Sequence, residues 1–287
     1  MKIFADTADK EEIVAAIASG IVDGVTTNPS LIKKAQEKYG VKDIKAYIEE
    51  ILQVAGDKPV SLEVTETTYE AMKSEALRLW SLFKKYKNVN IKIPVNPSSD
   101  HEHSDNYDGI KLTKELAEKG IPVNSTLIMT PEQAVLAAKA GAAYVSPFAG
   151  RIDDYLRANK MGLQKGKGFD KTDYYPAEGN EDSDSNEEVH DNGIVSGVDL
   201  VYNIVQIFKN YGFKTEVLAA SLRNARQVRE CMLAGAHIAT LPFNVLNDLT
   251  AHYLSVEGII GFAKDTVPEY RELLKDKRKF AINVSKE

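Results

Sequence analysis

The sequence predicts an α/β fold: a single (β/α)8 TIM barrel with one insertion between strands six and seven. Short β-branched runs alternate with longer amphipathic stretches, which is typical of parallel strands joined by helical crossovers. The chain holds eight such runs in 287 residues, the number and length that a barrel needs. Polar side chains also recur where the runs end, at the edge where barrels build their sites. We therefore expect one barrel domain over residues 1–287.

The eight expected strands are rich in Val, Ile and Thr and are bounded by turn-forming residues. They cover residues 2–5, 24–27, 60–65, 89–94, 122–128, 143–148, 215–220 and 237–240. The helices expected between them include residues 70–85, 107–118, 131–140, 194–211 and 224–234. The third of these helices has clear boundaries, because Thr130 is a good N-cap, Pro131 suits the first helical position and Gly141 ends the helix.

One interval between strands is much longer than the others. Strand six starts at residue 143 and strand seven at residue 215, a gap of 72 residues, whereas the other gaps are 21 to 36. This interval contains an acidic insertion, which we place at residues 155–193 and expect to be solvated and mobile. Its core, EGNEDSDSNEEVHD at residues 178–191, has seven acids and neither Lys nor Arg. A calcium loop is not expected there, because Glu187 stands where such a loop requires glycine.

The overall charge excludes several classes of protein. The net charge is −6, but the 36 basic and 35 acidic residues outside that acidic core leave +1. The chain therefore lacks the basic footprint that a dedicated binder of nucleic acid or of an anionic membrane requires. No segment approaches the roughly 18 apolar residues that would span a bilayer. We expect no nucleic-acid partner and no membrane partner.

Three smaller observations concern location and metals. Asp6 and Asp9 stand near the start of the chain, where a signal peptide would need an apolar stretch. The single cysteine, Cys231, is expected in a helix core and indicates a reducing compartment. We therefore expect a cytoplasmic protein. His101 and His103 have a spacing seen in metal sites, but they lie in a polar loop and no metal is expected.

The fourth strand carries a lysine that needs an explanation. Residues two apart in a strand share a face, so Asn90, Lys92 and Pro94 lie on one side, and Ile91 and Ile93 on the other. An uncompensated buried ammonium costs several kcal/mol. Either Lys92 points outward between helices, or it caps a buried acid, or it is a desolvated amine that attacks a carbonyl carbon and forms a Schiff base.

Other strands place polar groups on the same side at the same end of the barrel. They are Ser61, Glu63 and Thr65; Asn124 and Thr126; Ser146 and Phe148; Ser221 and Arg223; and Asp6 and Asn28, just past strands one and two. Imine chemistry also needs a carboxyl group that moves protons through water. Glu63 and Asp6 are the candidates.

Two arginines near the ends of strands six and seven suit a phosphate group. Arg151 and Arg223 offer planar donor forks, and Ser221 adds a hydroxyl close to the start of the following helix. The alternative for each arginine is an ion pair, with Asp153 or Asp154 as the acid. A phosphorylated small molecule is therefore the expected partner if the arginines remain available.

These motifs resemble those of the transaldolase family, which includes the fructose-6-phosphate aldolases. The matching segments are DTA at residues 6–8, GVTTNPSL at 24–31, SLEV at 61–64, IKIP at 91–94, NSTLI at 124–128, SPFAGRIDD at 146–154, AASLR at 219–223 and ATLPF at 239–243. They span nearly the whole chain in the family's order. The resemblance implies a cofactor-free (β/α)8 enzyme that moves a dihydroxyacetone unit from a ketose phosphate to an aldose phosphate.

The resemblance also implies roles for the site residues. Lys92 would form the Schiff base, Glu63 would activate the catalytic water that Thr126 helps to hold, and Asp6 would be the acid/base for the hydroxyl at the cleaved bond. The expected substrate-binding residues are Asn28, Asn124, Ser146 and Phe148 around the dihydroxyacetone unit, and Arg151, Ser221 and Arg223 at the phosphate.

Two positions favour one branch of the family. The fructose-6-phosphate aldolases carry Gln where this chain has Glu63 and Tyr where it has Phe148. Transaldolase activity in the pentose phosphate pathway is therefore expected, with sedoheptulose 7-phosphate or fructose 6-phosphate as donor and glyceraldehyde 3-phosphate or erythrose 4-phosphate as acceptor. Fructose-6-phosphate aldolase activity is the nearest alternative, and a non-catalytic sugar-phosphate sensor is the alternative from another class.

Assembly into a homo-oligomer is also expected from the resemblance, but its size stays open. The chain otherwise looks like the short members of the family, which are often decamers. YLRANK at residues 155–160 and YYPAEG at 174–179 resemble the longer, usually dimeric members. The charged tail at residues 266–287 is expected to form a terminal helix or a subunit contact.

Overall fold

The computed structural model describes residues 1–99, 106–160, 162 and 194–275. The chain divides into two compact units, Met1–Asp248 and Leu249–Glu287. The sequence pattern predicts one barrel domain over residues 1–287 and gives no sign of the boundary at Asp248. His101, His103 and residues 163–193 of the expected insertion lie outside the described residues, as does the acidic core at 178–191.

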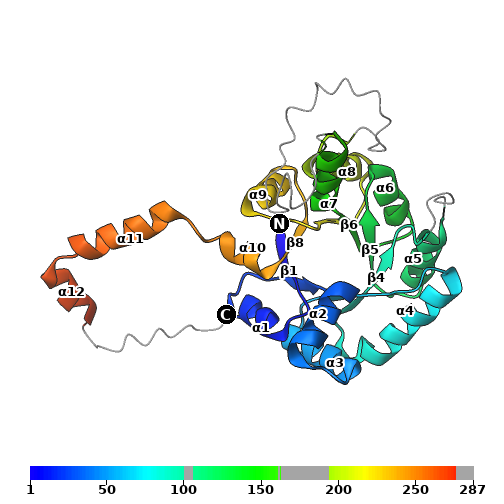
Figure 1. The fold of residues 1–287 in the computed structure, drawn as a ribbon, viewed down its shortest axis with the longest axis horizontal. Helices are drawn as coiled ribbons and strands as arrows, with labels where there is room; N and C mark the ends of the chain where they lie inside the picture. Colours follow the sequence, from blue (N-terminus) through cyan, green and yellow to red (C-terminus); the bar gives the residue numbers. More distant parts are fainter. Residues whose placement is uncertain (100–105, 161, 163–193, 276–287) are drawn as a thin grey trace. The chain divides into compact units, whose positions relative to one another are not determined.

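The first unit is a closed barrel of eight parallel strands in chain order, which confirms the predicted fold (Figure 1). The strands are β1 Lys2–Asp6, β2 Gly24–Thr26, β3 Val60–Glu63, β4 Val89–Pro94, β5 Val123–Ile128, β6 Tyr144–Pro147, β7 Glu216–Ala219 and β8 Ile238–Leu241. Each lies within two residues of its expected bounds, the usual uncertainty of element ends. Asp6 is the last residue of β1 rather than the residue after it.

Helices surround the strands in the first unit (Figure 1). They are α1 Lys10–Ala18, α2 Pro29–Tyr39, α3 Ile44–Ala55, α4 Tyr69–Phe83, the 3-10 turn η1 Lys84–Tyr86, α5 Asp108–Glu118, α6 Pro131–Lys139, α7 Ala149–Lys160, α8 Gly197–Tyr211, α9 Ala225–Leu233 and α10 Phe243–Asp248. The expected capping of α6 is observed, since the Thr130 side chain accepts the Gln133 N–H.

Helix α7 corrects one expected boundary. The sequence predicts that the mobile insertion starts at residue 155, but residues 155–160 form the second half of α7. The helix starts directly after β6 and packs closely against the β7–α9 connection: a Cβ added to Gly150 would lie 2.1 Å from the Ser221 carbonyl oxygen. Leu156 is fully buried, so this segment contributes to the barrel's packing rather than to a solvated loop.

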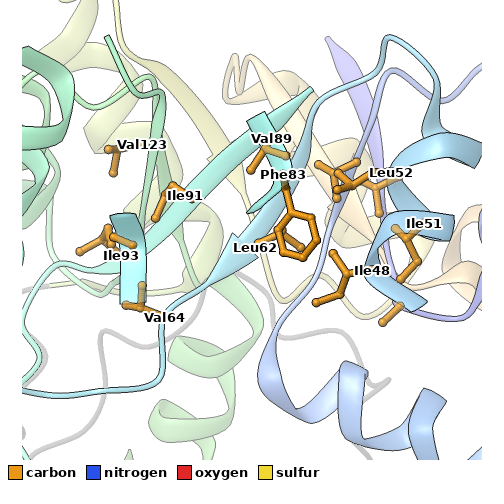
Figure 2. Packing of buried hydrophobic residues seen from close by; sticks show 14 of the residues in the cluster. Ile48, Ile51, Leu52, Leu62, Val64, Phe83, Val89, Ile91, Ile93 and Val123 are labelled. Carbon is orange, nitrogen blue, oxygen red and sulfur yellow. The ribbon is translucent and has the colours of Figure 1, made fainter. Parts of the chain in front are cut away.

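The main apolar core lies between the strands and the helices around them. Figure 2 shows Ile48, Ile51 and Leu52 of α3 gathered near Phe83 of α4 and Leu62 of β3. These side chains are buried because an amphipathic helix presents its apolar stripe to the sheet. Burying one large aliphatic side chain stabilises the fold by about 1.5–3 kcal/mol.

Strand β4 shows how this packing positions the site. Ile91 and Ile93 are fully buried in the same core (Figure 2). Alternation along the strand therefore directs Asn90 and Lys92 to the opposite face, the barrel interior. The residue pairing Glu63↔Lys92 between β3 and β4 sets these two side chains next to each other.

A smaller apolar cluster lies inside the barrel. Phe4, Leu218 and Ile238 form it with Ala220, and Tyr144 and Phe148 pack against it. Phe4 shares a strand face with Asp6, two positions later, and Ile238 shares one with Thr240. Both polar residues lie nearer the carboxyl end of their strand. Gly24 lies beside Phe4 in this cluster, because a Cβ added to Gly24 would be 2.6 Å from the Phe4 ring. The polar side chains at the carboxyl ends of these strands thus lie next to a layer of apolar side chains inside the barrel.

The second unit contains α11 Tyr253–Asp265 and α12 Pro268–Lys275, and neither helix has a buried residue. Helix α12 confirms that the described part of the charged tail is helical. Across the described ranges of both units, no helix combines the length and apolarity needed to cross a membrane.

Candidate active site

Lys92 lies inside the barrel and faces an acid. Its residue is 5% exposed, and its Nζ atom lies 2.9 Å from Glu63 Oε2. Nζ also donates to the Thr27 carbonyl oxygen at 3.3 Å and lies 6.0 Å from the centre of the Phe148 ring. The outward orientation considered for Lys92 is therefore wrong. The pairing with a buried acid is observed, and it leaves the amine in the interior beside a proton acceptor.

Asp6 occupies the same interior, across from Lys92. The Thr26 hydroxyl donates to Asp6 Oδ1 at 2.7 Å, and the Thr26 and Thr240 hydroxyls lie 2.5 Å apart. Burial raises the pKa of Asp6 above its ordinary value, while the positive charge of Lys92 and the Thr26 hydrogen bond oppose that rise. A carboxyl group whose pKa is raised holds a proton more readily than an ordinary one, which suits it to taking up and returning a proton.

A row of buried polar groups joins strands β3, β5 and β6. The Ser146 hydroxyl donates to Asn124 Oδ1 at 2.6 Å, and Asn124 Nδ2 donates to Ser61 Oγ at 3.1 Å. Thr126 is fully buried, and its hydroxyl has no hydrogen-bond partner among the described residues. An orphaned buried hydroxyl is costly unless a water or ligand satisfies it.

Asn28 is the N-cap of α2, and its side chain accepts the Leu31 N–H at 3.0 Å. The cap occupies the amide oxygen, so the NH2 group remains as the donor that Asn28 offers to a ligand.

The two arginines behave differently. Arg223 donates to Asp154 Oδ2 at 2.8 Å, whereas the Arg151 guanidinium lies over the Phe148 ring, 5.1 Å from its centre. Within the described residues, the ion-pair alternative is therefore observed for Arg223 and not for Arg151. Ser221 adopts a left-handed φ of +63°, a conformation that costs a non-glycine residue about 1 kcal/mol or more.

Most of the expected site residues line one cavity of about 480 Å³. They are Asp6, Asn28, Glu63, Lys92, Ser146, Phe148, Arg151, Ser221 and Arg223. Asn124 and Thr126 do not line it, but Asn124 contacts the cavity through its bond to Ser146. The cavity thus brings the Lys92 amine, two carboxyl groups and two guanidinium groups together at the carboxyl ends of the strands.

The cavity lining also contains residues that sequence reasoning missed. Thr26 and Thr240 obey the same alternation as the residues singled out, so the pattern could have found them. Ser30 and Lys34 lie one turn apart on α2, a spacing that puts both on one helix face. Leu127 was not foreseeable: the pairing of β5 with β6 shifts register there, and its φ of +58° redirects the side chain.

The described residues hold no group of three or more His, Cys, Asp or Glu side chains that could bind a metal ion. Cys231, expected in the core, is fully buried on α9.

Comparison with known proteins decides the family. Residues 3–286 match the family described as Transaldolase/Fructose-6-phosphate aldolase. The chain belongs to this family. A probable transaldolase of Chlorobium phaeobacteroides (strain BS1) is 40% identical over 268 residues, covering 92% of this chain and 97% of that protein. Probable transaldolases of Geotalea daltonii and Petrotoga mobilis are each 38% identical, covering 92% and 96% of this chain and 97% and 99% of their own lengths.

As a member of the transaldolase/fructose-6-phosphate aldolase family, the chain is an enzyme, and the names of its relatives indicate a transaldolase. The substrates of this family are sugar phosphates. The resemblance noted from the motifs is thereby confirmed over nearly the whole chain.

Proposed function

We propose that this enzyme transfers a dihydroxyacetone unit through a Schiff base on Lys92. The carrying observation is the buried Nζ atom, 2.9 Å from the Glu63 carboxylate inside the cavity. A desolvated amine beside a proton acceptor is suited to attack on a ketose carbonyl carbon. The donor would be sedoheptulose 7-phosphate or fructose 6-phosphate, and the acceptor glyceraldehyde 3-phosphate or erythrose 4-phosphate, as in the pentose phosphate pathway.

The imine would form in two steps that Glu63 assists. Lys92 loses a proton to Glu63 and its nitrogen adds to the carbonyl carbon, giving a carbinolamine. The carbinolamine then loses its hydroxyl group as water, and Glu63 supplies the proton through a water molecule. The unsatisfied hydroxyl of Thr126 would help to hold that water. Asn28, Asn124 and Ser146 would bind the hydroxyl groups of the dihydroxyacetone unit.

Cleavage of the adjacent C–C bond would depend on Asp6. The carboxylate takes the proton of the hydroxyl group on the carbon that leaves, the C–C bond breaks, and its electron pair passes into the imine to give an enamine. Burial raises the pKa of Asp6, so the carboxyl group can return this proton to the acceptor aldehyde when the new bond forms. Arg151, Ser221 and Arg223 would hold the phosphate.

Glu63 and Phe148 favour transaldolase over the fructose-6-phosphate aldolase alternative. Because Phe148 has no hydroxyl group, it offers no extra proton donor to the enamine. The three-carbon unit would therefore wait for an aldehyde acceptor instead of leaving as free dihydroxyacetone.

Trapping tests this proposal. Fructose 6-phosphate and borohydride should give a stable adduct that mass spectrometry locates on Lys92, and Lys92→Met should abolish it. Lys2→Met is a matched control, because Lys2 also lies 2.9 Å from a glutamate but is half exposed. Binding of fructose 6-phosphate without any adduct on Lys92 would overturn the Schiff base and favour the sensor.

A second measurement separates the two enzymatic functions. Without an aldehyde acceptor, we expect little free dihydroxyacetone, and with glyceraldehyde 3-phosphate we expect transfer. Glu63→Gln should slow adduct formation, since an amide cannot accept the lysine proton. Rapid acceptor-free release of dihydroxyacetone would instead support the aldolase.

Assembly into a homo-oligomer and a cytoplasmic location remain predictions. Helices α11 and α12 support the first, because large apolar side chains such as Ile259, Phe262 and Leu273 are about two-thirds or more exposed within that unit. Sedimentation of the full chain, compared with a variant carrying Phe262→Glu, would test it: a monomeric parent would contradict the prediction.

A further inference from the structure

A buried glutamine forms a hydrogen bond with the backbone of the segment that carries Ser221 and Arg223. We call residues 221–223 the phosphate arm. Gln227, on α9, is 3% exposed, and its Oε1 atom accepts the Arg223 backbone N–H at 2.8 Å. Its Nε2 atom donates to Asp153 Oδ2 at 2.7 Å. One side chain therefore ties the backbone of the arm to a carboxyl group on α7.

Asp153 fixes the orientation of that glutamine. Asp153 is also 3% exposed, and its second oxygen accepts the backbone N–H of Gly197, the first residue of α8, at 2.7 Å. An ionised carboxylate only accepts hydrogen bonds. Gln227 must therefore turn its NH2 group toward Asp153, which leaves its carbonyl oxygen for the Arg223 N–H.

A comparison within the same barrel shows that helix capping alone does not require this arrangement. Gln133 of α6 accepts the backbone N–H of Met129 at 2.8 Å and forms a capping box with Thr130. Gln227 likewise accepts the backbone N–H of the residue before the N-cap of α9, Arg223, and the Asn224 side chain accepts the Gln227 N–H. No described carboxylate contacts the Gln133 side chain, so the bond from Gln227 to Asp153 is additional to the cap.

The phosphate arm needs external support. Ser221 holds an unfavourable φ of +63°, which persists only where the surroundings impose it. Gly150 presses on the arm from α7: an added Cβ would lie 2.1 Å from the Ser221 carbonyl oxygen and 2.6 Å from Arg223 Nε. Asp154, next to Asp153, holds the Arg223 guanidinium at 2.8 Å. Helix α7 thus contacts both the backbone and the side chain of the arm.

We infer that Gln227 and Asp153 are positioning residues that hold the phosphate arm in the conformation that binds the phosphate of the substrate. This inference rests on the proposed function, in which Ser221 and Arg223 bind that phosphate. It predicts an effect on affinity for phosphorylated ligands and none on the chemistry at Lys92.

The first test removes the side-chain hydrogen bonds of Gln227 and keeps a side chain of similar size and shape. Gln227→Met should raise KM for fructose 6-phosphate roughly tenfold, because the phosphate arm then loses the acceptor of its Arg223 N–H, with kcat nearly unchanged. The dissociation constant of inorganic phosphate, measured by calorimetry, should rise by a similar factor. Borohydride trapping of dihydroxyacetone, which has no phosphate, should be unaffected. Gln133→Met is the matched control and should change stability without changing any of these affinities.

The second test exchanges the two groups. In Gln227→Glu two carboxylates face each other, and in Asp153→Asn only one acceptor remains for two donors, so both variants should bind phosphate weakly. The double variant Gln227→Glu/Asp153→Asn restores every bond: the introduced glutamate accepts from Arg223 and from the introduced amide, whose oxygen accepts from Gly197. We expect its KM to return toward the parent value. This comparison stands even if Gln227→Met fails to fold.

The outcomes separate this inference from the proposed function. If the parent forms the Lys92 adduct but Gln227→Met changes KM no more than Gln133→Met does, the positioning role is wrong. If the double variant binds phosphate no better than the single variants, the orientation argument is wrong. A parent without any Lys92 adduct would overturn the proposed function instead, and the titrations with inorganic phosphate would still decide the role of Gln227 and Asp153.

Discussion

The ion pair between Lys92 and Glu63 allows a quantitative prediction about stability. Both side chains are nearly buried, with 6% and 11% of their surfaces exposed, and the charged atoms are 2.9 Å apart. With an effective dielectric constant of about 20, two unit charges at that distance attract by about 6 kcal/mol. Glu63→Gln removes this attraction but leaves the ammonium in the barrel, where neutral oxygens such as the Thr27 carbonyl still accept from it.

We expect Glu63→Gln to reduce the free energy of unfolding by about 3–5 kcal/mol at pH 7, the typical effect of deleting one partner of a buried pair. For a barrel of this size, that corresponds to a fall in Tm of roughly 6–20 °C. Differential scanning calorimetry and urea unfolding would measure both quantities.

Two further variants make the result interpretable. Lys2 and Glu216 form an ion pair at the same distance, 2.9 Å, but their side chains are 51% and 29% exposed, so Glu216→Gln should cost no more than about 1 kcal/mol. The double variant Lys92→Met/Glu63→Gln removes both buried charges and should recover most of the lost stability. If Glu63→Gln destabilises the protein no more than Glu216→Gln does, then Glu63 does not compensate the burial of Lys92.

Three other predictions concern the surroundings of the site. Burial raises the pKa of Asp153 from 3.8 to about 6, so protonation should stabilise the folded state by up to about 3 kcal/mol; this contribution is complete below pH 3.8 and disappears as pH rises through about 6. Asp153→Asn should flatten the dependence of unfolding free energy on pH across that window, and an unchanged slope would contradict the assignment. Gly150→Ala should weaken phosphate binding by displacing the Ser221 carbonyl oxygen, whereas Gly258→Ala, with nothing within 4 Å of its added Cβ, should not. Burial raises the pKa of the Cys231 thiol to about 12, so a thiol reagent at pH 8 should modify it only after unfolding, and rapid labelling of the folded protein would refute its burial.

The strand pattern was sufficient to predict the barrel and the residues that face its interior. Successive side chains in a strand point to opposite faces, so Ile91 and Ile93 in the outer core require Lys92 to lie inside. The same alternation predicted the position of Glu63 beside it, because parallel strands in register bring their carboxyl ends together. Both predictions use only the alternation of side chains along each strand and the parallel arrangement of strands in a barrel.

Other features could not be predicted from the sequence pattern. They depend on a local break in strand alternation, on packing that composition does not reveal, or on a helix outside the strand pattern. Residues 155–160 look polar enough for a loop, but packing of Leu156 makes them the end of α7. Leu127 faces the cavity because a register shift breaks the alternation in β5. Lys34 reaches the same cavity from α2, a helix that strand periodicity does not describe.

Which charged groups pair with one another was decided by the tertiary structure. Asp154 could have paired with Arg151, three positions away, but it pairs with Arg223, 69 positions away. Gln227 meets Asp153 across 74 positions. The sequence determines the periodicity of neighbours along the chain and hence which faces are apolar. Partner choice and the desolvation that raises the pKa of Asp6 depend on atoms that only folding brings together, since electrostatic and hydrogen-bond energies vary with distance and burial.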